Sequence, residues 1–233
     1  MKRFFATAVA CVLTLSLAGC GTKNTSSSGT EAVSKDLAQS EQSAESQNNQ
    51  ETTQTISYDS LDDLPENSEE DFYFTETSEG IRIDSYGGAS PVVVIPATIG
   101  GKPVVELRDS AFANSKVEAV VIPENVKRIG EYVFQNCVDL RYVKMREGLS
   151  SIGGAAFFGC TSLEKADIPE GVECFEDYLF FGTQSLKQVS IPASVTEMPG
   201  GITIQCPDLV IVTPAGSVAE TVAKEEGLTV VNP

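Results

Sequence analysis

Large apolar residues recur every 23 positions along the chain after residue 90. The columns that keep this step are Val126, Leu149, Val172 and Val195; Ile129, Ile152, Phe175 and Met198; Phe134, Phe157 and Phe180; and Leu140, Leu163, Leu186 and Leu209. Because chance does not hold so many columns in register over successive units, the pattern indicates copies of one structural unit. It predicts a solenoid, in which stacked coils share one core that no single coil could bury alone.

Each unit contains two short extended segments and a turn. Residues 140–145 have the apolar pattern of a short β-strand. Sister units carry Pro at the next position, such as Pro169, which ends the strand because proline cannot donate a ladder hydrogen bond. A second brief apolar stretch, such as 126–129, precedes the turn that holds the aromatic residue. We expect parallel strands about 4.8 Å apart in successive coils, with an aromatic spine of Phe112, Phe134, Phe157 and Phe180.

The pattern changes at both ends of the repeats. Residues 72–83 hold two apolar runs around a Glu-Gly turn, which predicts a β-hairpin. At the other end, Ser217 and Glu220 have the spacing of a capping box, so a short helix to about Glu226 is expected. Residues 228–231 then predict a last strand. These terminal elements are expected to cap the solenoid, because an open end invites edge pairing.

The N-terminus has the composition of an export signal. Lys2 and Arg3 precede the apolar stretch 4–17, which is too short for a membrane span and has no stop-transfer pattern after it. The stretch ends in Leu17-Ala18-Gly19-Cys20, which resembles a bacterial lipobox. That resemblance implies cleavage before Cys20 and lipid on its side chain, and two or more acyl chains anchor a protein stably. The alternative is an ordinary signal-peptidase site near Cys20.

Residues 21–55 are rich in Ser, Thr, Asn and Gln, with Val33 and Leu37 as their large apolar residues. Such a segment cannot bury enough surface to offset its ordering entropy, so we expect a disordered, acidic tether. A spacer that lifts the domain off the membrane and an inert leader are both open. The chain then divides into a signal peptide (1–19), lipidated Cys and tether (20–55), acidic lead-in and N-terminal cap (56–90), repeats (91–205), and last coil with C-terminal cap (206–233).

Composition narrows the chemistry. The chain has 33 acidic and 16 basic residues, a formal net charge of −17, and no His. An acidic chain is a poor nucleic-acid binder, since phosphates require a basic surface. Without His there is no imidazole base or ligand. The acids around 62–71 and 170–177 lack calcium-loop spacing, so we interpret them as solvated faces rather than calcium or glycosidase sites. We expect no cofactor, no metal and no enzymatic activity.

Three cysteines share one position of the repeat. Cys137, Cys160 and Cys206 are in register, and Thr183 occupies the intervening coil. One interpretation is a disulfide or redox pair between Cys137 and Cys160, because adjacent coils place Cα atoms within disulfide reach. A soft-metal site is disfavoured because Thr183 interrupts the series. We favour a buried ladder of small, weakly polar side chains.

A cluster of basic and aromatic residues lies on the predicted strands of an otherwise acidic domain. Its members are Arg141, Tyr142, Lys144, Arg146 and Lys165. Outward strand positions also include Ala119 and Val121. Since aromatic and Arg side chains are frequent binding hot spots, we predict that these five residues, the basic-aromatic patch, contact a partner. The alternative is an ordinary solvated strand face.

The repeat resembles the BspA-like, or treponemal-type, leucine-rich repeat, whose unit is also about 23 residues long. The matching marks are Ala111-Phe112, Ile129-Gly130, Ile152-Gly153, Asn136-Cys137 and the run from Gly159 to Leu163. Met145-Arg146 and Phe175-Glu176 depart from the Ile-Pro and Ile-Gly marks. The resemblance covers roughly 72–233 and implies a β-rich leucine-rich-repeat solenoid.

For function, the resemblance implies a lipid-anchored protein of the bacterial envelope that recognises other proteins, on host matrix or mucosa or on other cells. The alternative is a structural spacer without a high-affinity ligand. Fold and function separate easily, so the ligand and the oligomeric state stay open.

Overall fold

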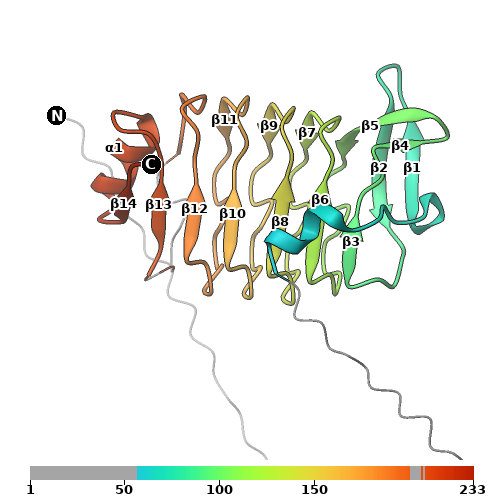
Figure 1. The fold of residues 1–233 in the computed structure, drawn as a ribbon, viewed down its shortest axis with the longest axis horizontal. Helices are drawn as coiled ribbons and strands as arrows, with labels where there is room; N and C mark the ends of the chain where they lie inside the picture. The colour runs from blue at the N-terminus through green and yellow to red at the C-terminus, as the bar shows by residue number, and fades with distance from the viewer. Residues whose placement is uncertain (1–56, 200–205, 207) are drawn as a thin grey trace, which may run out of the picture. The chain divides into compact units, whose positions relative to one another are not determined.

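The computed structural model describes residues 57–199, 206 and 208–233 (Figure 1). Its strands wind as successive coils of a solenoid, and the coils place strands alternately in two sheets. The front sheet contains β3 (Val92–Val94), β6 (Ala119–Ile122), β8 (Tyr142–Met145), β10 (Lys165–Asp167), β12 (Gln188–Ser190), β13 (Val210–Val212) and β14 (Thr229–Val231). The rear sheet contains β1 (Phe72–Glu76), β2 (Ile81–Tyr86), β4 (Thr98–Ile99), β5 (Lys102–Leu107), β7 (Arg128–Ile129), β9 (Ser151–Ile152) and β11 (Cys174–Phe175).

The register of the front sheet repeats the sequence period. Tyr142 of β8 pairs with Ala119 of β6 on one side and with Lys165 of β10 on the other, and Lys165 pairs with Gln188 of β12. All these pairings are parallel, as the repeats require. Residues at the same position of successive units therefore lie side by side, which confirms the predicted leucine-rich-repeat solenoid.

An aromatic spine runs through the core between the sheets. Phe112, Phe134, Phe157 and Phe180 are each at most 1% exposed. The ring centroids of consecutive members lie 5.2, 5.4 and 5.4 Å apart. Tyr86 of the N-terminal hairpin continues the stack, at 5.4 Å from Phe112. The predicted spine is confirmed, and it extends into the cap.

The Ile-Gly mark of the repeat has a steric cause. A Cβ atom on Gly153 would lie 2.6 Å from the carbonyl carbon of Gly130 and 2.7 Å from the backbone nitrogen of Glu131. A Cβ on Gly130 would lie 2.7 Å from the backbone nitrogen of Asp109 in the preceding coil. Because backbone cannot move aside as a side chain can, a side chain at either of these two positions would force its coil away from the preceding one.

Both terminal elements form as predicted. β1 and β2 pair antiparallel as a hairpin beside β5. The helix α1 (Val218–Glu225) begins after Ser217, whose hydroxyl oxygen accepts from the backbone N–H of Glu220 at 3.0 Å. Gly227 follows the helix in the left-handed region, with φ of +75°, and β14 then joins the front sheet in parallel. The helices in the described part of the chain are too short to cross a bilayer.

The cysteine series forms the predicted buried ladder. Cys137, Cys160 and Cys206 are free thiols, and each Sγ donates to a backbone carbonyl oxygen, at 3.0, 3.0 and 3.2 Å respectively. Burial raises the pKa of all three thiols. Thr183 fills the remaining position, with its hydroxyl 3.4 Å from the Sγ of Cys206. The bridged alternative for Cys137 and Cys160 is not the arrangement in this structure, and the remaining described cysteine, Cys174, is exposed.

Candidate interaction surface

The predicted basic-aromatic patch assembles on the outward face of the front sheet. Tyr142 and Lys144 alternate with buried residues along β8, and Lys165 lies beside Tyr142 on β10. Arg141 immediately precedes β8 and Arg146 immediately follows it. The strand register therefore brings together all five residues that the sequence nominated.

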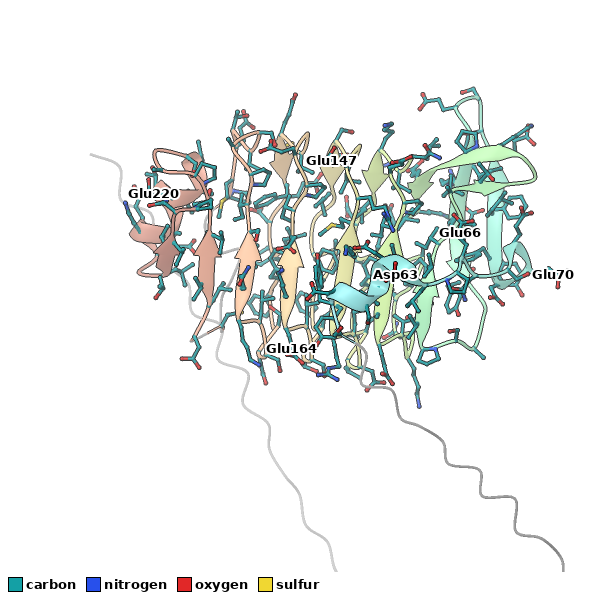
Figure 2. The ribbon with its side chains drawn as sticks, in the orientation of Figure 1. Asp63, Glu66, Glu70, Glu147, Glu164 and Glu220 are labelled. Carbon is teal, nitrogen blue, oxygen red and sulfur yellow. The ribbon has the colours of Figure 1, made fainter. Side chains whose placement is uncertain are left out.

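A segment from the N-terminal lead-in covers this face. We call residues 57–64 the strap; it contains the short 3-10 helix η1 (Asp59–Asp63) and crosses in front of β6 and β8 (Figure 1). Asp63 marks its position among the side chains of Figure 2. The helix ends there because Pro65 disfavours helical backbone at Leu64, which is extended with φ of −81° and ψ of 142°.

Leu61 is the apolar anchor of the strap. Its side chain is fully buried and packs in a cluster with Val94, Ala119 and Val121. Ala119 and Val121 were predicted to point outward, and they do face away from the solenoid core, but the strap buries them to 0% and 1% exposure. This part of the outward face is therefore not solvated.

Tyr58 occupies the centre of the patch. Its ring makes an edge contact with Tyr142 at 6.2 Å between centroids. The Nζ of Lys165 lies 4.3 Å from the Tyr58 ring centroid and that of Lys144 lies 5.2 Å from it, so two ammonium groups face one ring. Burial raises the pKa of Tyr58 above its ordinary value, and a hydrogen bond to the Asp167 carboxylate adds to the effect.

Asp62 connects the strap to two cations of the patch. Its carboxylate forms ion pairs with Lys144 and with Arg146, the latter at 3.3 Å. The hydrogen bond from Lys144 holds the pKa of Asp62 below its ordinary value, against a smaller opposing effect of desolvation. The strap thus places the Asp62 carboxylate against Lys144 and Arg146, next to the contact between Tyr58 and Tyr142.

The other cations of the patch have partners on the front sheet itself. Arg141 donates two hydrogen bonds to Glu164, at 2.7 and 3.1 Å, and these lower the pKa of the Glu164 carboxyl. Lys165 pairs with Asp167 at 2.9 Å. Burial alone would raise the pKa of Asp167, but hydrogen bonds, first from Lys165 and then from Ser190 and Tyr58, outweigh it and lower that pKa. Every cation of the patch is therefore paired.

Three acids of the lead-in are exposed, as predicted, but also have partners on the solenoid. Asp62 pairs with β8, as described above. Glu66 accepts a hydrogen bond from the backbone N–H of Ala97 at 3.0 Å, and Glu69 accepts from that of Gly100. Sequence reasoning counted the charges of this stretch and missed Tyr58 and Leu61. The signal available in the sequence was that Tyr58 and Leu61 lie three positions apart, the spacing of one helix face, within an otherwise acidic stretch.

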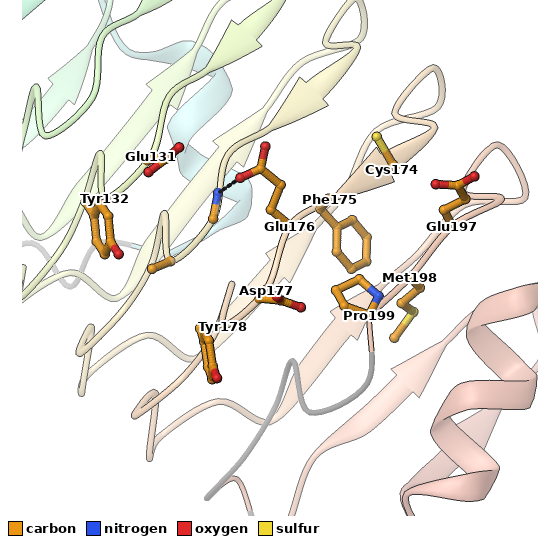
Figure 3. A pocket seen from close by; sticks show the side chains of 12 residues that line it. Glu131, Tyr132, Cys174, Phe175, Glu176, Asp177, Tyr178, Glu197, Met198 and Pro199 are labelled. Atoms are coloured by element: carbon orange, nitrogen blue, oxygen red, sulfur yellow. Dashed lines mark hydrogen bonds between the residues drawn. The ribbon is translucent and has the colours of Figure 1, made fainter. Parts of the chain in front are cut away.

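A separate cavity of about 650 Å³ opens at a corner of the rear sheet (Figure 3). Tyr132 and Tyr178 line it from turns two coils apart and are 41% and 55% exposed. Both have positive φ, 56° and 61°, a conformation that bulky residues rarely adopt. Ala155, the equivalent residue of the intervening coil, leaves the space between them open.

Carboxylates surround this cavity: Glu131, Glu176, Asp177 and Glu197. Glu176 accepts a hydrogen bond from the backbone N–H of Gly154 at 3.1 Å, and all four are exposed, as predicted for the acids around 170–177. Within the described ranges, no group of three or more His, Cys, Asp or Glu is placed to hold a metal ion.

Comparison with known proteins identifies the repeat. The sequence profile of the BspA-type leucine-rich repeat region matches residues 105–221 in six copies. A leucine-rich repeat protein of T. pallidum is 31% identical, with a TM-score of 0.61, and the match covers 64% of this chain and 71% of that one. One from Bacteroides capillosus is 27% identical, with a TM-score of 0.48, over 56% of this chain and 95% of that one. No match was found among curated proteins.

Proposed function

We infer the function from one premise: the chain belongs to the BspA-type leucine-rich repeat family. This family is associated with the bacterial cell surface and with protein interaction. We propose that the chain is a surface lipoprotein whose solenoid recognises a protein of the host matrix or mucosa, or of another cell. We propose a binding role without catalysis, since the chain has no His to serve as a base beside its carboxylates.

The observation that supports this proposal is the front-sheet face itself. Arg141, Tyr142, Lys144, Arg146 and Lys165 lie together there, beside the apolar residues Ala119 and Val121. A surface that combines aromatic, cationic and apolar groups is typical of protein-binding hot spots. This face already holds a peptide segment, the strap, through all three kinds of contact.

Binding can be tested on the chain from residue 21 onward, which leaves out the proposed lipid site. It would be screened against immobilised matrix and mucosal proteins, beside the double variant Tyr142→Ala/Lys144→Glu. Lys116→Glu, an exposed lysine outside the patch, is the matched charge control. We expect saturable binding by the wild type and by Lys116→Glu, and loss of binding in the double variant. Binding by none of the three proteins would favour the spacer alternative, and equal binding by all would place the recognition surface elsewhere.

The anchor is a separate part of the proposal. Cys20 lies outside the described residues, and the lipobox resemblance supports its lipidation. Mass spectrometry of the protein from its native membrane is expected to show acyl chains on Cys20 and none on a Cys20→Ala variant. A wild-type protein without lipid would contradict the anchor but would leave the recognition function untouched.

A further inference from the structure

We propose that the front-sheet face is a docking site for an acidic, tyrosine-bearing segment of a partner protein, and that the strap is its competitor within the same chain. This inference rests on the proposed function and specifies the partner's chemistry. It follows from the way in which the strap occupies the face. Three of its side chains, Tyr58, Leu61 and Asp62, fill three kinds of subsite.

The subsites are complementary to those side chains in different ways. Val94, Ala119 and Val121 form an apolar floor that takes one aliphatic side chain. Lys144 and Lys165 present two ammonium groups to an aromatic ring. The carboxylate of Asp167 lies beside the phenol of that ring, so this subsite suits a tyrosine hydroxyl better than a bare phenyl ring.

The remaining subsite takes the carboxylate. Lys144 and Arg146 both pair with Asp62. The spacing of the three side chains, Tyr-x-x-Leu-Asp, places ring, aliphatic group and carboxylate on these subsites at once. A partner segment with this chemistry would make the same contacts.

The strap is attached in a way that allows exchange. Among the described residues, no backbone hydrogen bond joins residues 57–64 to the front sheet, so side chains alone hold the strap. Asn67, by contrast, is bonded to the backbone of Val94 in β3. Its backbone N–H donates to the carbonyl oxygen of Val94 at 2.9 Å, and its side-chain oxygen accepts from the N–H of Val94 at 2.8 Å. Release of the strap would therefore stop at Asn67 and leave the lead-in beyond it in place.

The strap's apolar cluster is also separate from the solenoid core. Leu61 packs on the outward face with Val94, Ala119 and Val121, none of which belongs to the main core cluster. The coils do not need the strap to bury their own apolar residues. A covalently attached competitor has an effective concentration of the order of millimolar, so a partner binds weakly until the strap leaves.

The test uses a fluorescein-labelled peptide with the sequence of residues 57–67 and measures its binding to the chain from residue 21 onward by fluorescence polarisation. Two matched variants change the strap in the same way: Leu61→Ser removes the buried anchor, and Leu64→Ser changes a residue that is 37% exposed. We expect Leu61→Ser to bind the peptide at least about tenfold more tightly than the wild type, because burial of one leucine contributes that much or more. Leu64→Ser is expected to match the wild type.

Two controls show which contacts carry the binding. Adding Lys144→Glu to the Leu61→Ser variant is expected to abolish peptide binding, and a peptide with Lys in place of Asp62 is expected to recover part of it. A scrambled peptide of the same composition is expected not to bind. Circular dichroism of each variant checks that the solenoid is folded, so loss of binding is not confused with unfolding.

Three results would overturn the inference. Equal peptide affinities for Leu61→Ser and Leu64→Ser would show that the strap does not compete. If the scrambled peptide bound as tightly as the native sequence, the face would attract acidic peptides by nonspecific charge alone. A concentration-dependent dimer that Leu61→Ser abolishes would make the occupant a second copy of this chain. None of these results decides the proposed function, because the chain would still be able to recognise a protein through another surface. The matrix-protein screen tests that function separately.

Discussion

The structure contains two buried apolar clusters that the sequence encodes in different ways. The larger runs through the solenoid and consists mainly of columns that recur from coil to coil, such as the aromatic spine, together with residues of the two terminal elements. The smaller consists of Leu61 against Val94, Ala119 and Val121 on the outward face of the front sheet. Each column of the first cluster is present several times, whereas Leu61 comes from a segment without a repeat.

This difference separates stability from recognition. A residue of the repeated cluster packs against its equivalents in the coils on both sides, so its loss weakens the whole stack. Loss of Leu61 instead uncovers a surface while the stack remains. The basic-aromatic patch belongs to this second region: the strap pairs with Lys144 and Arg146 and lays the Tyr58 ring against Tyr142 and Lys165.

Phe157→Ala is expected to have the largest effect, because it removes a fully buried ring from the spine. Phe157 stacks on Phe134 and Phe180, each at 5.4 Å between centroids. We expect the free energy of unfolding to fall by about 3–5 kcal/mol, from lost transfer energy and the cavity left behind. Chemical denaturation measures it. The neighbouring Phe158→Ala is the control: Phe158 is half-buried and stacks on Phe181 alone, so a similar loss there would contradict the special role of the spine.

Gly153→Ala tests the close approach of the coils. Its new Cβ would meet the backbone of Gly130 and Glu131 at 2.6 and 2.7 Å, and we expect a loss of about 1–3 kcal/mol in the free energy of unfolding, the usual range for overpacking. Gly154→Ala makes the same change one residue later, where the nearest atoms are at 3.3 and 3.4 Å and one is the end of the Glu176 side chain. We expect that variant to unfold close to the wild type. Equal losses would assign the effect to backbone entropy instead.

The repeated region could be predicted from the sequence because its information is redundant. Phe134, Phe157 and Phe180, for example, occupy the same position of three successive units. The period, the strands and the aromatic spine can therefore all be predicted by aligning the chain on itself. The end elements were predictable for a local reason. The Ser217 cap and Gly227 stop depend on neighbouring residues alone.

The candidate site was predictable only in part. Strand periodicity placed Tyr142, Lys144 and Lys165 on one face, and the structure confirms that grouping. The strap's position depends on a contact between residues 82 positions apart, Asp62 and Lys144, and no period connects them. Counting charges predicted that Asp62 is exposed, which it is, but could not show that the neighbouring Leu61 is buried or that Asp62 pairs with Lys144.

Leu61→Ser is expected to affect the strap alone. Because its cluster lies outside the solenoid core, the denaturation midpoint of the coils should stay close to the wild-type value, while amide exchange of residues 58–63 increases. Hydrogen exchange read by mass spectrometry, peptide by peptide, separates the two effects. Leu64→Ser serves as the matched control. Faster exchange throughout the solenoid in Leu61→Ser would show that the two clusters form one cooperative unit.

The smallest effect concerns pH. In the docked strap the hydrogen bond from Lys144, opposed in part by desolvation, lowers the pKa of Asp62. A group with a lowered pKa stabilises the folded arrangement above its unfolded pKa, about 4 for Asp, and this contribution is lost as the pH falls through the lowered value. Glu164 and Asp167 also have lowered pKa values and lie beside the patch, so they titrate in the same direction. The strap is therefore expected to stay docked from neutral pH down to about pH 4 and to loosen below it.

Tyr58→Trp provides a specific probe of this loosening, because the chain has no tryptophan. We expect its emission to stay constant above about pH 4 and to shift to longer wavelength below it, as the indole becomes exposed. Adding Asp62→Asn should give the shifted emission in part at neutral pH, whereas Asp63→Asn, one residue along and without an ion pair in the described structure, should leave the titration unchanged. If Asp62→Asn and Asp63→Asn titrate identically, the Asp62 pair does not hold the strap, and the contacts of Leu61 and of the ring at position 58 carry the docking.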